Sequence, residues 1–166
     1  MLTAVTNATG NSAGAKLRCL YTNALSLISK LDELKLRLAE LSPDVLAVTE
    51  TWLSGNISNS EKALTGYKIY RRDRGHCQGG GIAVYVNEGL AMSENITKFA
   101  CVTEAIWLTI KNTASPCIDV PTVYRPPRTD QIADTQLLEQ LEKFSSRPNI
   151  MIMSDLNAPG TNWNTL

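Results

Sequence analysis

Two stretches of the chain repeat apolar residues at the spacing of an amphipathic helix. The first is predicted to begin at the capping-box-like Ser29–Asp32 and to end at 42–44, where Pro43 stops it. The second is predicted to begin at Asp130, whose carboxylate can cap a helix. The residues expected to face inward are Leu31, Leu34, Leu38 and Leu41 in the first helix, and Leu137, Leu138, Leu141 and Phe144 in the second.

Shorter apolar runs lie before, between and after these helices and predict strands. The runs at 45–48 and 149–153 are apolar throughout or nearly so, which is typical of strands buried on both faces. Pro121 falls inside another predicted strand, where proline removes a donor from the hydrogen-bond ladder. The predicted strands are 16–23, 45–48, 67–70, 82–86, 105–110, 118–124 and 149–153.

The order of these elements predicts an α/β fold. Four strands between 67 and 124 follow one another without helices, which indicates antiparallel hairpins. The strands are too many for one sheet of ordinary size, and each helix needs a sheet for its apolar face. We therefore expect a layered α/β/β/α sandwich of two packed mixed sheets flanked by helices. Residues 1–15, rich in Thr, Asn, Ala, Ser and Gly, are expected to form a flexible leader.

Composition narrows the possible functions. The length of 166 residues suits one domain, and 16 basic residues balance 16 acidic ones. This balance argues against a strongly basic nucleic-acid-binding protein, so any basic patch must be local. It is compatible with a nuclease that places carboxylates at its centre. Because the sequence shows neither a signal peptide nor a membrane-spanning run, we expect an intracellular protein that does not enter a membrane.

The four cysteines show no zinc-binding spacing. They are Cys19, Cys77, Cys101 and Cys117, and none belongs to a C-x-x-C pair. We expect free thiols in a reducing compartment, with a disulfide framework as the minor alternative.

Polar residues stand at the carboxyl ends of several predicted strands. They are Asn23, Glu50, Tyr124 and the pair Asp155 and Asn157. If these strand ends converge, they supply the hard oxygen ligands that Mg²⁺ prefers, a carboxylate that can accept a proton from water, and donors for phosphoryl oxygens. This set favours metal-assisted hydrolysis of a phosphodiester over acyl transfer.

Each of these features also has a structural explanation. Glu50 can cap a loop at the sheet edge, Asp155 and Asn157 can form an Asx turn, and Asn23 can do the same. Tyr124 can be an ordinary strand aromatic with an exposed hydroxyl. The run Gly79–Gly81 is interpreted as a hairpin turn, since it precedes a strand and lacks the Lys-Ser/Thr of a phosphate-binding loop.

Charged residues precede this glycine run. Arg71, Arg72 and Arg74 are suited either to a nucleic-acid backbone or to a solvated loop.

Six strings of the sequence together resemble the endonuclease domain of non-LTR retrotransposons. That domain belongs to the endonuclease/exonuclease/phosphatase superfamily, which includes deoxyribonuclease I and the apurinic endonucleases. The resemblance covers nearly all of 17–163. The strings are YTNALSL (21–27), PDVLAVTETWL (43–53), GYKIYRRDR (66–74), GGGIAVYV (79–86), VYRPP (123–127) and MSDLNAPGTNW (153–163).

The resemblance implies a role for each candidate residue. Glu50 would bind Mg²⁺, with Mn²⁺ as an alternative, and Asn23 would help to hold metal or phosphate. Tyr124 would contact the scissile phosphate, and Arg125 of the same string would bind substrate. Asp155 would orient or deprotonate the attacking water, and Asn157 would bind the phosphate beside it. The implied substrate is DNA, which such domains nick, and the implied location is the nucleus; no obligate protein partner is inferred.

The sequence also departs from the family pattern. Leu25 replaces an arginine, and Ser154 and Leu156 replace the glycine and phenylalanine of a G-D-F-N string. The family continues to an S-D-H string with a catalytic histidine, whereas the only histidine here is His76, in a loop. We therefore expect 16–166 to be a partial domain, incomplete at the C-terminus, with weak or no activity. The alternatives are a non-catalytic remnant or binding module with the same fold, and a phosphatase acting on another phosphoester.

Overall fold

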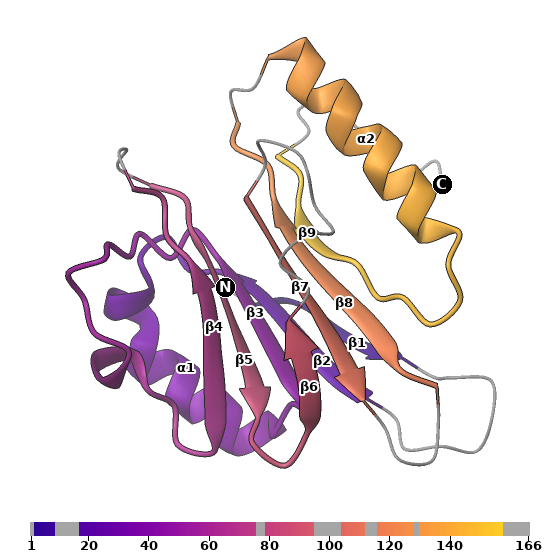
Figure 1. The fold of residues 1–166 in the computed structure, drawn as a ribbon. Coiled ribbons are helices and arrows are strands. Elements are labelled where there is room, and N and C mark those ends of the chain that lie inside the picture. The colour runs from indigo at the N-terminus through magenta and orange to yellow at the C-terminus, as the bar shows by residue number, and fades with distance from the viewer. Residues whose placement is uncertain are drawn as a thin grey trace.

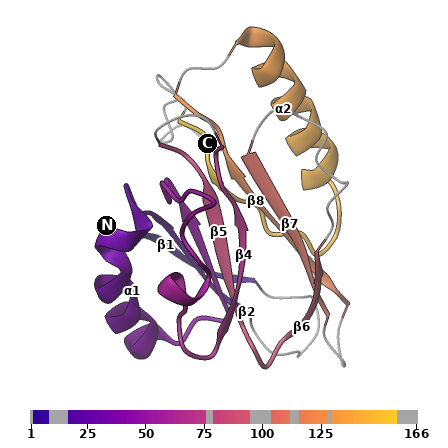
Figure 2. The same ribbon diagram turned by 60° about the vertical axis from the view of Figure 1, so that its left-hand side comes forward.

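Two β-sheets packed face to face, each covered on its outer side by a helix, form the described part of the chain (Figures 1 and 2). The computed structural model describes residues 2–8, 17–75, 79–94, 104–111, 116–127 and 130–157. Its layers run helix, sheet, sheet, helix, and both sheets mix parallel and antiparallel pairs. The predicted α/β/β/α sandwich is confirmed.

The first sheet has the strand order β1-β2-β3-β5-β4. β2 and β3 run parallel because α1 (Leu27–Leu41) carries the chain back between them, and the other pairs are antiparallel. A 3₁₀ turn at Ser60–Lys62 lies in the connection from β3 to β4. The strands are β1 (Leu2–Ala8), β2 (Leu17–Asn23), β3 (Val45–Thr49), β4 (Tyr67–Arg72) and β5 (Ile82–Asn87).

The expected flexible leader is wrong for Leu2–Ala8. These residues form β1, which pairs antiparallel with β2 along the edge of the sheet. The small polar residues of this segment show no regular apolar alternation, so the pattern predicted no strand there. The strand forms because its backbone N–H and C=O groups find hydrogen-bond partners on β2. The rest of the predicted leader lies outside the described residues.

The second sheet has the strand order β6-β7-β8-β9. α2 (Gln131–Ser145) connects β8 to the parallel strand β9, while the other pairs are antiparallel. The short strand β6 was not predicted, because its sequence AMSE carries no hydrophobic pattern. The strands are β6 (Ala91–Glu94), β7 (Glu104–Lys111), β8 (Ile118–Tyr124) and β9 (Met153–Asp155).

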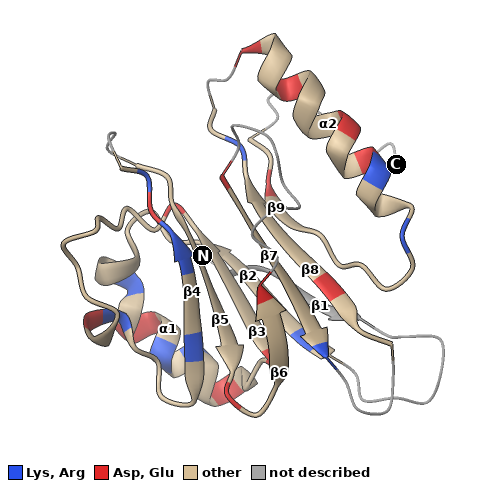
Figure 3. Cartoon of the chain, in the orientation of Figure 1, with Lys and Arg blue, Asp and Glu red and all other residues tan. Residues whose placement is uncertain are grey.

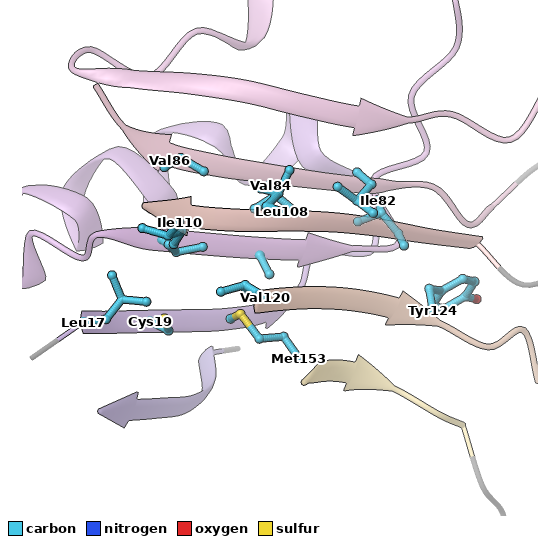
Figure 4. Packing of buried hydrophobic residues seen from close by; sticks show 13 residues of the cluster. Leu17, Cys19, Ile82, Val84, Val86, Leu108, Ile110, Val120, Tyr124 and Met153 are labelled. Carbon is cyan, nitrogen blue, oxygen red and sulfur yellow. The ribbon is translucent and has the colours of Figure 1, made fainter. Parts of the chain in front are cut away.

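Strict alternation of side chains divides the core into layers. In β3 all five residues are buried, with Val45 and Ala47 facing the second sheet and Leu46 and Val48 facing α1. The layer between the sheets contains aliphatic side chains from both, with Tyr124 at one end (Figure 4). Burial on both faces explains why these strands have no polar alternation.

The helix boundaries differ from the prediction at one end of α1. The helix begins at Leu27 after Ser26, and the side chain of Ser26 makes no capping bond. Ser29 Oγ instead donates to the carbonyl of Ser26 at 2.9 Å, so the capping box predicted at Ser29 is wrong. In α2 the predicted cap is confirmed, because the Asp130 carboxylate accepts from the Ala133 N–H at 2.7 Å. Leu138, predicted to face inward, is 61% exposed.

Pro121 explains why the last strand is shorter and later than predicted. The Asp119 N–H donates to the Asn149 carbonyl, the Asp119 carbonyl accepts from the Met151 N–H, and the Arg125 N–H donates to the Asp155 carbonyl. The odd-numbered positions in and just after β8 therefore face β9. Position 121 has the same phase, and proline has no N–H to donate there. The ladder therefore breaks after the bridge between Asp119 and Ile150 and resumes at Met153. The strand predicted at 149–153 is observed at Met153–Asp155.

No helix among the described residues is long and apolar enough to cross a membrane.

Candidate active site

The strand ends that carry the candidate residues meet at one end of the sandwich. In the first sheet, Asn23 at the end of β2 lies beside Thr49 at the end of β3, directly before Glu50. In the second sheet, Tyr124 at the end of β8 lies beside Asp155 at the end of β9. Each sheet thus contributes a pair of parallel strand ends, the place where α/β sheets commonly present functional side chains.

Backbone hydrogen bonds fix the loops that follow β2 and β3. The Ser26 and Leu27 N–H groups donate to the carbonyls of Glu50 and Thr51, both at 2.9 Å, and the Trp52 N–H donates to the Gly80 carbonyl at 2.9 Å. Glu50 has a φ of 54°, a left-handed conformation that a non-glycine residue adopts only when its surroundings hold it there. The backbone therefore places the Glu50 carboxylate in a fixed position.

The Glu50 carboxylate collects hydrogen-bond donors from three segments. Its Oε2 accepts from Trp52 Nε1 at 2.7 Å and from the Gly80 N–H at 2.9 Å, and its Oε1 accepts from the Tyr124 hydroxyl. Partial burial alone would raise the pKa of Glu50, but these donors and the nearby Arg74 charge outweigh it and hold the pKa below its usual value. Glu50 is therefore a carboxylate, as a metal ligand must be.

Asn23 and Asp155 join the two sheets by a second contact. Asn23 Nδ2 donates to Asp155 Oδ2 at 2.8 Å, and Asn23 Oδ1 accepts from the Leu25 N–H at 3.2 Å. The Asn157 N–H donates to Asp155 Oδ1 at 3.2 Å, while Asn157 Nδ2 donates to the Arg125 carbonyl at 2.8 Å. The Asp155 carboxylate is thus oriented from both sides.

Two tyrosines line this junction, and sequence reasoning identified only one of them. Burial, with the neighbouring Glu50, raises the pKa of Tyr124, so its hydroxyl remains a donor. Burial also raises the pKa of Tyr21, whose hydroxyl lies 2.7 Å from Thr49 Oγ1 and whose neighbours include Asp155 and Glu50. The signal for Tyr21 was its place two residues before Asn23, on the same face of β2.

Arg125 has a different environment from the one expected of a substrate ligand. Its Nε and Nη2 both donate to the Asp134 carboxylate, at 2.7 and 2.6 Å. Its Nη1 donates to the carbonyls of Leu156 and Asn157 at 3.1 and 2.8 Å. Substrate binding by Arg125 stays a prediction; the observed contacts tie α2 to the loop that carries Asn157.

The donor set fits a hard divalent cation. Mg²⁺ commonly takes one or two carboxylates and keeps several waters, and Glu50, Asp155 and the Asn23 amide oxygen are oxygen donors of that kind. Within the described part of the chain, no three His, Cys, Asp or Glu side chains gather into a metal cluster. The residues therefore fit a site completed by water and substrate, not an all-protein cage.

Charged residues of both signs gather around this end of the sandwich. Figure 3 shows basic and acidic segments at the upper ends of β4, β8 and β9. The Arg74 side chain forms an ion pair with Glu104 and lies over the Tyr124 ring. His76, the one histidine of the chain, lies outside the described residues, as do Cys77 and Cys101; Cys19 is buried and Cys117 exposed, and both are free thiols.

The sequence profile of the endonuclease/exonuclease/phosphatase family matches residues 11–166. The chain belongs to this family. A comparison with curated protein sequences finds no match.

Solved structures with the same fold include enzymes with different substrates. The endonuclease domain of TRAS1, a telomere-specific non-LTR retrotransposon, has a TM-score of 0.63 and 14% identity, over 89% of this chain and 62% of that one. The AP endonuclease LMAP from Leishmania major has a TM-score of 0.67 and 17% identity, over 86% and 55%. ANGEL2, a 2',3'-cyclic phosphatase, has a TM-score of 0.61 and 19% identity, over 86% and 53%. The chain thus spans between about half and three fifths of the length of these proteins.

Proposed function

We propose that this domain is a Mg²⁺-dependent phosphodiesterase of the retrotransposon endonuclease type and that its substrate is DNA. The observation that carries the proposal is the junction of the two sheets. Tyr124 of the second sheet contacts Glu50 of the first, and Asn23 of the first contacts Asp155 of the second. Four residues from four strand ends therefore face one another, and the TRAS1 domain and LMAP share the fold that arranges them.

Each side chain has a role that its contacts support. Glu50, ionised and fixed by its donors, is the ligand for Mg²⁺, or for Mn²⁺ in its place, and Asn23 Oδ1 assists it. The bound metal supplies charge neutralisation at the phosphoryl oxygens. Asp155, oriented by Asn23 and Asn157, positions the attacking water and accepts its proton. Asn157 Nδ2 donates its second N–H to the phosphate, and Tyr124 redirects its hydroxyl hydrogen bond from Glu50 to the phosphate, as negative charge develops there.

The rate of this reaction in the 166-residue chain is proposed to be low. A histidine that would protonate the leaving oxygen is not among the described residues, and His76 is the only one in the sequence. A non-catalytic binding module with the same fold is the second candidate. It is favoured by Leu25, which occupies the rim beside Asn23 with 61% of its surface exposed, where the family pattern has an arginine. The proposed location, in the nucleus, follows from DNA as substrate.

Nicking of supercoiled plasmid tests the proposal. The chain is compared with Glu50→Gln and Asp155→Asn, which keep side-chain shape and remove one charge each. Glu40→Gln, on the exposed face of α1, is the matched control. We expect slow Mg²⁺-dependent nicking that falls at least about 100-fold in the two site variants and is unchanged in the control.

Three outcomes separate the candidates. Equal nicking by the chain and by Glu50→Gln would overturn the assignment of the site. Mg²⁺ binding by calorimetry without nicking would favour the binding module. Hydrolysis of a small cyclic or monoester phosphate in preference to plasmid DNA would keep the site and change the substrate.

A further inference from the structure

Arg74 lies beside the candidate site but has no assigned role in the proposed reaction. It follows β4, and its guanidinium carbon lies 5.7 Å from the centroid of the Tyr124 ring. Its Nε donates to Glu104 Oε1, at the start of β7. The side chain is 26% exposed, so the guanidinium is supported by the protein and still reaches solvent.

Gly80 also lies close to the Arg74 guanidinium. A Cβ added to Gly80 would lie 2.6 Å from the guanidinium carbon of Arg74, 2.7 Å from its Nε and 2.9 Å from its Nη2. The φ of Gly80 is +75°, which also disfavours any other residue. The guanidinium therefore lies close against the Gly80 backbone and beside the Tyr124 ring. The same Gly80 donates its N–H to Glu50 Oε2, so one residue places both the carboxylate and the arginine.

The terminal nitrogens of Arg74 have no partner in the described part of the chain. Arginine carries five N–H donors in a planar fork, and only the Nε of Arg74 donates to a described residue. The neighbouring residues Arg71 and Arg72, by contrast, use terminal nitrogens in contacts within the protein. Arg71 donates to the Ile57 carbonyl and pairs with Asp73, and Arg72 donates to the Ala105 carbonyl. Arg74 thus has a fixed orientation and unused donors next to Glu50 and Tyr124.

We propose that the terminal nitrogens of Arg74 bind a phosphoryl oxygen of the DNA backbone at the Glu50 and Tyr124 site. This inference rests on the proposed function and adds a substrate-binding cation to it. A planar guanidinium donates to two oxygens of a phosphate at once, and a side chain already held in place loses little freedom on binding. Among the described residues around the scissile phosphate, the other candidates are two carboxylates, two amides and a phenol, and the Arg125 guanidinium already pairs with Asp134, which leaves Arg74 to neutralise charge that the metal does not.

A purely structural role for Arg74 is the rival explanation. The Glu104 carboxylate accepts from Arg74 through Oε1 and from the Gly81 N–H through Oε2 at 2.6 Å, so the pair also fixes the glycine turn. If Arg74 serves only this turn, then removing either partner must have the same consequence for DNA binding. If Arg74 binds phosphate, removal of the Arg74 guanidinium weakens DNA binding whereas removal of the Glu104 charge does not.

Titration of a labelled DNA duplex in EDTA, at several salt concentrations, distinguishes the two roles. The EDTA prevents hydrolysis and removes the metal contribution. We expect Arg74→Gln to weaken binding about tenfold and to reduce the slope of log affinity against log salt by about 0.9, which corresponds to one lost phosphate contact. Arg74→Lys keeps the charge, so the slope is retained although affinity falls. Arg18→Gln, at the start of β2 and so at the opposite end of that strand from Asn23, leaves both unchanged.

Glu104→Gln supplies the decisive comparison. This variant keeps the cation and removes an opposing negative charge, so we expect unchanged or tighter binding. Weaker binding by Glu104→Gln, equal to that of Arg74→Gln, would overturn the inference and assign Arg74 to the turn. A salt slope in Arg74→Gln equal to that of the unaltered chain would overturn it as well. Failure of the unaltered chain to bind DNA in EDTA at any salt concentration would also overturn the inference, whereas the proposed function is tested separately by nicking in Mg²⁺.

Discussion

The two outer faces of the sandwich are covered unequally. Under α1, the first sheet buries a large cluster in which Leu20, Leu46 and Tyr85 pack against Leu27 and other helix leucines. Under α2, the corresponding cluster consists of Ala105, Val123 and Leu137, with Leu141 and Leu156 only partly buried, and Phe144 packs edge-on against Trp107 beside it. Two helices of equal length, 15 residues each, therefore contribute different amounts of apolar contact.

The two halves of the candidate site lie on these differently covered sheets. Asn23 ends β2 and Glu50 follows β3 in the well-covered sheet. Asp155 ends β9, a strand of three residues at a sheet edge, and Asn157 lies just after it. Regions with few buried contacts open locally at lower free energy than the rest of a domain. The half of the site proposed to bind metal is thus built on the better-covered layer pair, and the half proposed to position water depends on fewer contacts.

The largest effect is expected from truncating one leucine on each helix. Leu34 and Leu137 are both central in their helices and are 5% and 2% exposed. Leucine-to-alanine changes in cores cost about 2–5 kcal/mol, depending on how completely the cavity is surrounded. We expect Leu34→Ala to cost about 4 kcal/mol and Leu137→Ala about 2 kcal/mol. Urea unfolding of the two variants measures the difference.

The same chemical change is made at both positions, so each variant is the control for the other. Leu138→Ala, on the exposed side of α2, gives the effect of helix propensity alone and is expected to stay within about 0.5 kcal/mol. An equal or larger cost at Leu137 would show that the second layer pair is as well packed as the first, and the comparison would fail.

The better-covered half was also the easier one to predict from sequence. Continuous apolar runs such as 45–48 and 82–86 determine strands buried on both faces, and the observed strands Val45–Thr49 and Ile82–Asn87 agree within a residue. The second half was predicted less well, because its signals are weak. β6 has no apolar pattern, Leu138 follows the helical period but faces solvent, and the β9 boundary depends on the phase of Pro121 relative to a distant strand.

The candidate site was also only partly predictable from the sequence. Its strand-end residues were identified individually, since each follows an apolar run, and Asn23, Glu50, Tyr124 and Asp155 do meet. The contacts between them were not predictable, because they join positions such as Asn23 and Asp155 that are 132 residues apart. The close approach of Arg74 to Gly80 likewise depends on three-dimensional packing that no local pattern encodes.

A smaller effect is expected at Arg125, which holds the less covered half together. Arg125→Lys keeps the charge but cannot reproduce the fork that contacts Asp134 and two carbonyls at once. We expect a loss of about 1–2 kcal/mol in stability and faster hydrogen exchange at 155–157, with little change in β3. Exchange measured by mass spectrometry locates the effect.

Arg37→Lys, on the exposed face of α1, is the matched control. Its ion pair with Glu40 is 3.4 Å long and its side chain is 50% exposed, so the expected cost is below about 0.5 kcal/mol. If Arg125→Lys accelerates exchange equally in β3 and at 155–157, then the two halves open together, and Arg125 is not a local clamp.

The smallest effect is expected from repairing the break in the β8–β9 ladder. Pro121→Val restores an N–H at the position that faces the segment before Met153, where the register offers the Met151 carbonyl as acceptor. The new hydrogen bond contributes about 1 kcal/mol, and the loss of proline's restriction of the unfolded chain removes about 0.4–1 kcal/mol of that gain. The net change in stability is therefore within about 0.5 kcal/mol, and amide exchange is the sharper measurement.

A protected amide at 121 with slower exchange at 151–155 would show that the ladder gap, and not the thin cover of α2 alone, weakens this half. Rapid exchange at 121 would mean that the segment 151–152 is held away from β8 by its own backbone, and that proline at 121 only accommodates a gap already present.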